Sequence, residues 1–214
     1  RLRIGMIIDS ITGFDTEAQT RATVEKTAAL LNGMGHTVEE MPMLIKESFI
    51  EDFSLYWSML AFMTQKTGRI VMDRSFDSDK LDGLSVGLAD LFKKNYHKAP
   101  LFLYRLRKTY SDYANAFAHY DVILSPVLAH TTPKLGHISP TVPFEALFGR
   151  LMRYVSFTPW ANAAGGPALS IPMGETEENV PISVQLMAGH GGERTLLEIA
   201  FEIEQANPWR KIHS

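Results

Sequence analysis

Short apolar runs alternate along this chain with longer segments in which apolar residues recur every three to four positions. The short runs predict β-strands at residues 2–9, 37–43, 120–126, 168–173 and 182–187. The longer segments predict amphipathic helices at residues 17–32, 47–67, 84–95, 101–119, 144–155 and 193–205. This order of elements predicts an α/β fold, with a mixed β-sheet flanked by helices.

The first strand, helix and second strand form a β-α-β unit. Its two strands should be parallel and its crossover right-handed, because a twisted strand followed by a right-handed helix packs back onto the sheet in that way. Val24, Ala28 and Leu31 lie at i, i+4 and i+7 and predict the buried face of the helix.

Two further helices have predicted apolar faces, and proline is expected to separate two others. The face of helix 47–67 consists of Ile50, Phe53, Trp57, Leu60 and Ala61. The face of helix 193–205 consists of Leu196, Leu197, Ala200, Phe201 and Ile203. Pro100 is expected to mark the break between helices 84–95 and 101–119.

Residues 127–143 should form an irregular loop after the strand at residues 120–126. Four of these residues are proline or glycine, and several others are serine or threonine. In open α/β sheets, ligands bind at the carboxyl ends of the strands, so we expect this loop to form a pocket wall. Farther along, Gly165 is expected to adopt a positive φ or to permit close backbone approach.

The composition excludes several classes of function but does not identify one. A mass of 24.0 kDa with 45% hydrophobic residues suits one domain, and we treat residues 1–214 as one portion of a domain. A formal charge of -3 gives no general attraction to nucleic acid or to anionic lipid. The absence of cysteine excludes disulfides and thiolate metal sites.

No apolar run approaches the roughly 18 residues of a membrane-spanning helix, so we expect no membrane association and a cytoplasmic location. Because the chain starts at Arg1, almost inside a strand, we also expect a fragment or a cleaved product.

Candidate chemistry is sparse. Seven histidines are present, but nothing in the sequence makes three or four of them converge, so we expect no metal site. The pairs Gly165-Gly166 and Gly191-Gly192 fit neither G-x-x-x-x-G-K-[ST] nor G-x-G-x-x-G, the two common phosphate-binding motifs. No cofactor is expected. Ser125, Ser156 and Ser170 lie beside or within apolar segments without a predictable base, and local structural roles are expected for them.

The segment from Thr158 to Gly174 has a distinctive spacing of small residues and prolines. Asn162, Gly165, Pro167, Ala168, Ser170, Pro172 and Gly174 fit the order N-x-x-G-x-P-A-x-S-x-P-x-G. With Glu193, Leu196 and Leu197 farther on, this segment resembles the C-terminal part of the amidase signature family. The opening β-α-β unit also looks like the start of that family's second half. Two positions depart from the family pattern: Val127 replaces a common threonine, and Ser183 replaces a glycine.

The resemblance implies hydrolysis of linear amides by a Ser, cis-Ser, Lys triad. In the family this triad lies in the N-terminal half, and this chain contains no Gly-Ser-Ser stretch. We therefore expect no catalytic residue here and no activity of the chain alone. Thr158, Trp160 and Ala161 are the residues expected to touch the acyl part of an amide substrate, although helix-capping or core roles for these three are an open alternative.

Three hypotheses follow for the chain. The leading one is the C-terminal part of an amidase, whose partners are a small amide substrate and the missing N-terminal half. Removal of that half should expose an apolar face and favour homo-oligomers. The alternatives are a non-catalytic binding module that uses loop 127–143 as its contact surface, and a fragment of an amidotransferase subunit that acts on loaded transfer RNA.

Overall fold

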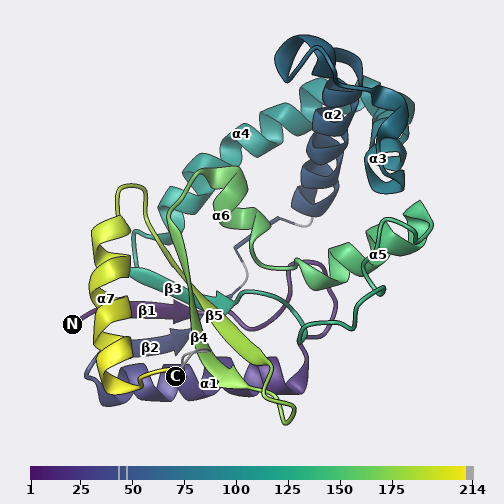
Figure 1. Cartoon of the computed structure of the whole chain (residues 1–214). Helices are drawn as coiled ribbons and strands as arrows, with labels where there is room; N and C mark the ends of the chain where they lie inside the picture. The colour runs from purple at the N-terminus through teal and green to yellow at the C-terminus, as the bar shows by residue number, and fades with distance from the viewer. Residues whose placement is uncertain (43, 47, 211–214) are drawn as a thin grey trace. The chain divides into compact units, whose positions relative to one another are not determined.

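The computed structural model describes residues 1–42, 44–46 and 48–210, and it divides the chain into two compact units. The sheet unit comprises residues 1–45, 109–132 and 154–214. The helical unit comprises residues 46–108 and 133–153. Figure 1 labels the helices and strands of both units.

The sheet unit is built on five strands in the order β2-β1-β3-β5-β4. These strands are β1 (Arg3–Met6), β2 (Thr37–Glu40), β3 (Val122–Pro126), β4 (Ala168–Glu175) and β5 (Pro181–Ala188). β1 is parallel to both β2 and β3, whereas β5 is antiparallel to β3 and β4. The prediction of a mixed sheet, opened by a parallel β-α-β unit, is confirmed. Strand 37–43 is shorter than predicted, and its last residue, Met43, lies outside the described residues.

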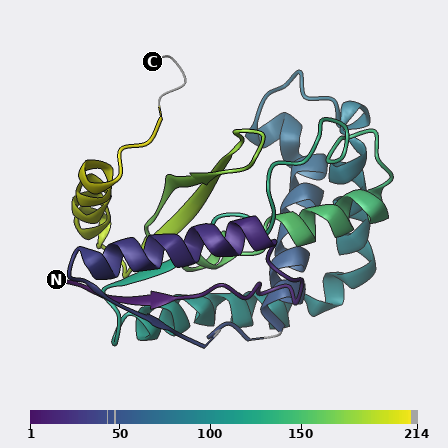
Figure 2. The ribbon, with the colours of Figure 1, turned by 90° about the horizontal axis from the view of Figure 1, so that it is seen from below.

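One face of the sheet is covered by α1 (Ala18–Gly33) and α7 (Glu193–Ala206). Figure 2 shows α1 running along the strands. Side chains alternate between the two faces of a strand, so Val122 and Leu124 of β3 point into this cluster while Ile123 points away from it. The predicted face of α1 is confirmed: Val24, Ala28 and Leu31 are all buried there.

The other face carries α6 (Pro159–Ala164) and the last residues of α4 (Ala99–Ala116). Tyr113 of α4 and Trp160 of α6 pack there with Ile123. α6 was not predicted from the sequence, because six residues are too few to show a helical period. Gly165 ends this helix with a φ of 67°, which confirms the predicted positive φ.

The predicted face of α7 is partly wrong. Leu196, Ile199 and Ile203 are the buried residues of this helix, whereas Leu197 and Phe201 are 51% and 62% exposed. Apolar residues lie on more than one side of α7, and its sequence does not show which side meets the sheet.

The helical unit contains α2 (Ser48–Val71), α3 (Gly83–Asn95), the first part of α4, and α5 (Phe144–Tyr154) as far as Arg153. Two short 3₁₀ turns, η1 (Ser78–Lys80) and η2 (Tyr96–Lys98), flank α3. Phe62 of α2 packs against Phe92 of α3, with 5.2 Å between the ring centroids. The predicted start of α2, Glu47, lies outside the described residues.

One prediction for this unit is wrong and another is confirmed. The buried residues of α2 are Phe49, Asp52, Ser54, Leu55, Ser58 and Gly68, so the predicted face lies beside the true one. Leu60 on that predicted face is 45% exposed. The predicted break between two helices near Pro100 is confirmed: α3 ends at Asn95 and α4 begins at Ala99, and Pro100 is the second residue of α4, where a missing N–H costs no helical hydrogen bond.

Candidate functional site

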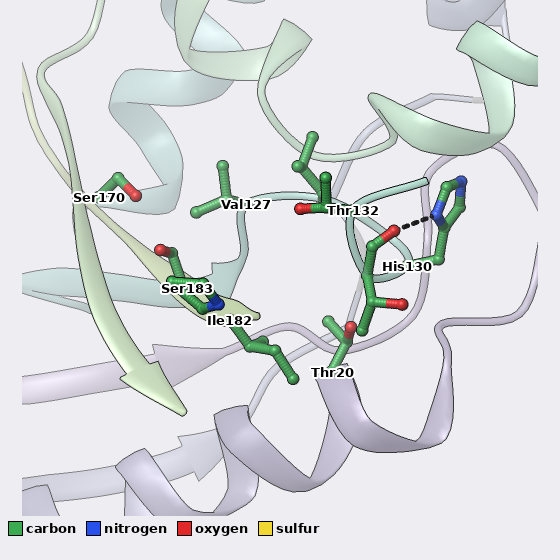
Figure 3. A pocket seen from close by; sticks show the side chains of 10 residues that line it. Thr20, Val127, His130, Thr132, Ser170, Ile182 and Ser183 are labelled. Carbon is green, nitrogen blue, oxygen red and sulfur yellow. Dashed lines mark hydrogen bonds between the residues drawn. The ribbon is translucent and has the colours of Figure 1, made fainter. Parts of the chain in front are cut away.

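A pocket lies in the sheet unit where the chain leaves β3 (Figure 3). Its volume is about 290 Å³, and its walls come from separate parts of the sequence. Residues 127, 128 and 130–132 form one wall, Thr20 of α1 another, and Ser170 with residues 181–183 the third. The prediction that loop 127–143 forms a pocket wall is confirmed for its first residues.

Hydrogen bonds hold the loop wall of this pocket in place. The Ala129 N–H donates to the Tyr154 carbonyl at 3.1 Å, and the Ala129 carbonyl accepts from the Glu17 N–H at 2.8 Å. The Glu17 carboxylate accepts from the Thr131 N–H at 2.6 Å. Because both the backbone and the side chain of Glu17 bind the loop, the start of α1 and the pocket wall form one connected structure.

His130 is also fixed in this wall. Its Nδ1 lies 2.8 Å from the Thr131 carbonyl oxygen, which can accept but not donate, so the Nδ1–H is the donor (Figure 3). Its ring packs against Tyr154, with 4.7 Å between ring centroids. In the neutral imidazole, Nε2 is therefore the free acceptor.

The pocket lining combines hydroxyl groups with apolar side chains such as Val127, Leu128 and Ile182, and its described residues include no acidic or basic side chain other than His130. Hydroxyl groups come from Thr20, Thr131, Thr132, Ser170 and Ser183. Such groups can donate and accept, so they suit neutral polar ligands. Sequence reasoning missed Thr20, Ser170 and Ser183 as members of one pocket, because their proximity depends on how α1 and the hairpin pack.

A second cavity of the sheet unit has a volume of about 390 Å³ and lies at the opposite ends of the strands. Arg3, Thr37 and Tyr120, at or just before the starts of β1, β2 and β3, line it. Ligands of α/β sheets bind at the carboxyl ends of the strands, so the pocket after β3 is the stronger candidate.

The three residues expected to touch a substrate lie at the start of α6, outside the residues that line either cavity. Trp160 and Ala161 are each 3% exposed, and the Trp160 ring meets the Tyr113 ring edge to face at 5.1 Å. Thr158 is partly exposed and precedes the helix, and its side chain makes no capping hydrogen bond. Of the three, Thr158 has the side chain that solvent can reach.

Two serines considered as nucleophiles have buried hydroxyls. Ser125 is 1% exposed; its Oγ donates to the Pro126 carbonyl at 2.9 Å, and the Gln185 amide lies 3.5 Å away. Ser156 is fully buried, with its Oγ 2.8 Å from Thr12 Oγ1. The third, Ser170, is exposed on β4 and lines the pocket.

Histidine and carboxylate side chains form no group of three that could hold a metal ion within residues 1–42, 44–46 and 48–210. His190, for example, lies with Nε2 2.8 Å from the Ala164 carbonyl and with its ring stacked at 4.0 Å on Tyr110. In the same described ranges, no helix combines the length and the apolar character needed to cross a bilayer.

The mixed sheet with helices on both faces and the Asn162 to Gly174 segment define an α/β protein of amidase type. The Amidase family model matches residues 1–197, and the chain belongs to this family. The protein named "Putative amidase AmiC" from Mycobacterium leprae is 39% identical over 215 residues, which cover 99% of this chain and 45% of that protein. The chain therefore spans about half the length of the curated relatives it matches, and it corresponds to their C-terminal part.

Solved structures agree with this assignment. A 6-aminohexanoate cyclic dimer hydrolase complexed with substrate superposes with a TM-score of 0.82 at 25% identity, covering 97% of this chain and 45% of that one. A bacterial aryl acylamidase of the amidase signature family has the same fold, with a TM-score of 0.73 at 14% identity and coverage of 97% and 44%.

Proposed function

We propose that this chain is the C-terminal part of an amidase that hydrolyses non-peptide carboxamides, and that it supplies part of the substrate pocket without the reacting groups. The observation that carries the proposal is the match of nearly the whole chain to 45% of a protein named as an amidase. The Ser, cis-Ser, Lys triad would lie in the other part of such an enzyme. The burial of Ser125 and Ser156 supports the proposal that the reacting serine lies in that other part.

Thr158, Trp160 and Ala161 have different roles in this proposal. The Thr158 hydroxyl is the group that would contact the substrate, because it is partly exposed at the start of α6. The buried Trp160 and Ala161 would contribute through their packing, which holds the start of α6 against the sheet. A variant that lacks the Thr158 hydroxyl should therefore lose substrate affinity without losing the fold.

The remaining part of the enzyme would be the partner of this chain. The outer side of β4 suits such a partner, because β4 is an edge strand on which Ala168 and Ser170 are exposed. In its absence we expect homo-oligomers that form through uncovered surface. We expect the complete enzyme to work in the cytoplasm, without nucleic acid or membrane partners.

The direct test is hydrolysis by the chain alone. The 6-aminohexanoate cyclic dimer and a set of simple primary amides should be turned over no faster than in buffer. A serine-directed fluorophosphonate should leave the chain unlabelled. Turnover that this reagent abolishes would show that the reacting serine is present in these residues.

A second candidate function, in a transfer-RNA-dependent amidotransferase, is favoured by one observation. Part of the chain, 95 residues, is 39% identical to a glutamyl-tRNA(Gln) amidotransferase component of Halothermothrix orenii, covering 44% of this chain and 18% of that protein. The formal charge of -3 does not favour contact with phosphates. A gel-shift titration with transfer RNA at low salt decides between the two: the amidase proposal predicts no complex.

A further inference from the structure

We propose that this chain forms a two-fold symmetric dimer in which the β4 edges of two copies pair as antiparallel strands. β4 is the last strand of the sheet order, with β5 on one side only. The inference deepens the expectation of homo-oligomers and rests on that part of the proposed function. Its tests measure mass and strand pairing, whereas hydrolysis tests the proposed function, so the two can fail separately.

The outer edge of β4 presents backbone groups that β5 does not use. The Ala188 N–H donates to the Pro167 carbonyl at 3.2 Å, so the backbone of Pro167 faces β5. Successive residues of a strand direct their backbone groups to opposite sides, and those of Ala168 and Ser170 therefore point away from β5. Both residues are exposed, and Figure 3 shows Ser170 on this strand. Such a row of N–H and C=O groups is a template for another strand.

The exposed stretch of β4 is suited to pairing with itself. A two-fold axis perpendicular to the sheet reverses the strand direction, so two copies of one edge meet as antiparallel neighbours. Residues 168–174 carry no charged side chain, so no like charges oppose each other across the axis. Pro172 has no N–H, which favours a register centred on Leu169, with Ala168 opposite Ser170 of the second copy. In this register each outward N–H meets a carbonyl of the other copy.

The opposite edge of the sheet, β2, is poorly suited to the same pairing. Its outward Val38 N–H is already used, because it donates to the Asn32 side-chain oxygen at 3.0 Å. β2 has only four residues, and two of them, Glu39 and Glu40, are acidic. A second copy of β2 would bring these carboxylates close to their own counterparts, and charged side chains of this kind protect natural edge strands. The sheet is therefore open to a second copy at β4 rather than at β2.

Helix α7 adds apolar surface beside this edge. It packs on β4 and β5, so a two-fold axis at the β4 edge places the two α7 helices on the same face of the joined sheet. Leu197 and Phe201 of this helix are 51% and 62% exposed. Exposed apolar side chains of this size mark contact surfaces, and their burial by the second copy would add to the hydrogen bonds between the strands.

The first test is the mass of the 214-residue chain in a dilution series, measured by analytical ultracentrifugation. We expect a dimer that dissociates to the 24.0 kDa monomer. Ser170→Pro removes one outward N–H from each copy and no bond to β5, so the dissociation constant should rise about tenfold or more. Glu40→Pro is the matched control, because it changes the outer edge of β2, and it should leave the dissociation constant unchanged. A monomer at every concentration, or equal effects of the two proline variants, would overturn the inference.

Cysteine pairs test the register without weakening the edge. The chain has no cysteine, so Ala168→Cys and Ser170→Cys each introduce a single thiol. Opposite residues of a ladder have Cα atoms about 5.5 Å apart, within reach of a disulfide, whereas diagonal neighbours are about 7–8 Å apart. We expect a mixture of the two variants to form disulfide-linked dimers under mild oxidation, and either variant alone to form few. No cross-link in the mixture, or equal cross-linking of either variant alone, would contradict the proposed pairing.

Discussion

Substitution of Gly166 by alanine tests the packing that holds the start of α6. A Cβ atom at this position would overlap the ring of Tyr113. That ring has nowhere to move: Tyr113 is fully buried, its hydroxyl donates to the Ala188 carbonyl at 2.9 Å, and Trp160 and Phe117 pack against it at 5.1 and 4.8 Å. Overpacking of this kind costs about 1–3 kcal/mol, and loss of the hydrogen bond adds about 1 kcal/mol, so we expect Gly166→Ala to cost about 2–4 kcal/mol.

The assay is urea unfolding followed by tryptophan fluorescence, to which the buried Trp160 contributes. Gly33→Ala is the matched control, because Gly33 is the last residue of α1 and a Cβ there meets no atom within 4 Å. This control should be neutral or stabilising by up to about 1 kcal/mol. A Gly166→Ala variant within about 0.5 kcal/mol of the parent, below the range expected for an overpacked core, would refute the assigned contact between Gly166 and Tyr113.

Three further predictions concern other parts of the chain. Asn179 has a φ of 60° in the turn between β4 and β5, so Asn179→Ala should cost about 1 kcal/mol in thermal unfolding while Asn179→Gly costs nothing. Burial raises the pKa of Asp52 above its ordinary value of 3.8, against the opposing attraction of Arg105. The folded state thus binds this proton more tightly than the unfolded state, and stability is lost as the pH rises through the folded pKa. Asp52→Asn should therefore gain stability relative to the parent between acidic and neutral pH, and a pH-independent difference in urea midpoints would contradict this. Paired Leu197→Glu and Phe201→Glu changes should reduce oligomers in light scattering, since both side chains are exposed on α7; an unchanged mass distribution would exclude this face.

The elements that the sequence predicted well are those with a strong repeating pattern. The strand after Tyr120 was recognised because its apolar residues follow one another without interruption. The face of α1 was recognised from the spacing of Val24, Ala28 and Leu31, although threonines make up the rest of its buried residues. In α7, apolar residues on two sides fit more than one face, and contact with the sheet decides that Leu196 is buried while Leu197 is exposed. The face of α2 was misplaced for the same reason.

The candidate site was predictable in part. Proline and glycine after β3 indicated a loop, and the place of this loop at the end of a strand indicated a pocket wall. Thr20 gave no signal, since a threonine in a helix is unremarkable until the fold places it against residues more than a hundred positions away. The roles of Thr158, Trp160 and Ala161 came from family resemblance and stay predictions.

The most direct test of the central claim is an activity measurement on a chimera. "Putative amidase AmiC" from Mycobacterium tuberculosis matches this chain at 38% identity over 215 residues. In the chimera, this chain replaces the matching C-terminal part of AmiC and is joined to the rest of AmiC. The account predicts amide hydrolysis by the chimera that Thr158→Ala weakens through a raised KM, and no hydrolysis by this chain alone. A folded chimera without activity, or turnover by this chain alone, would contradict it.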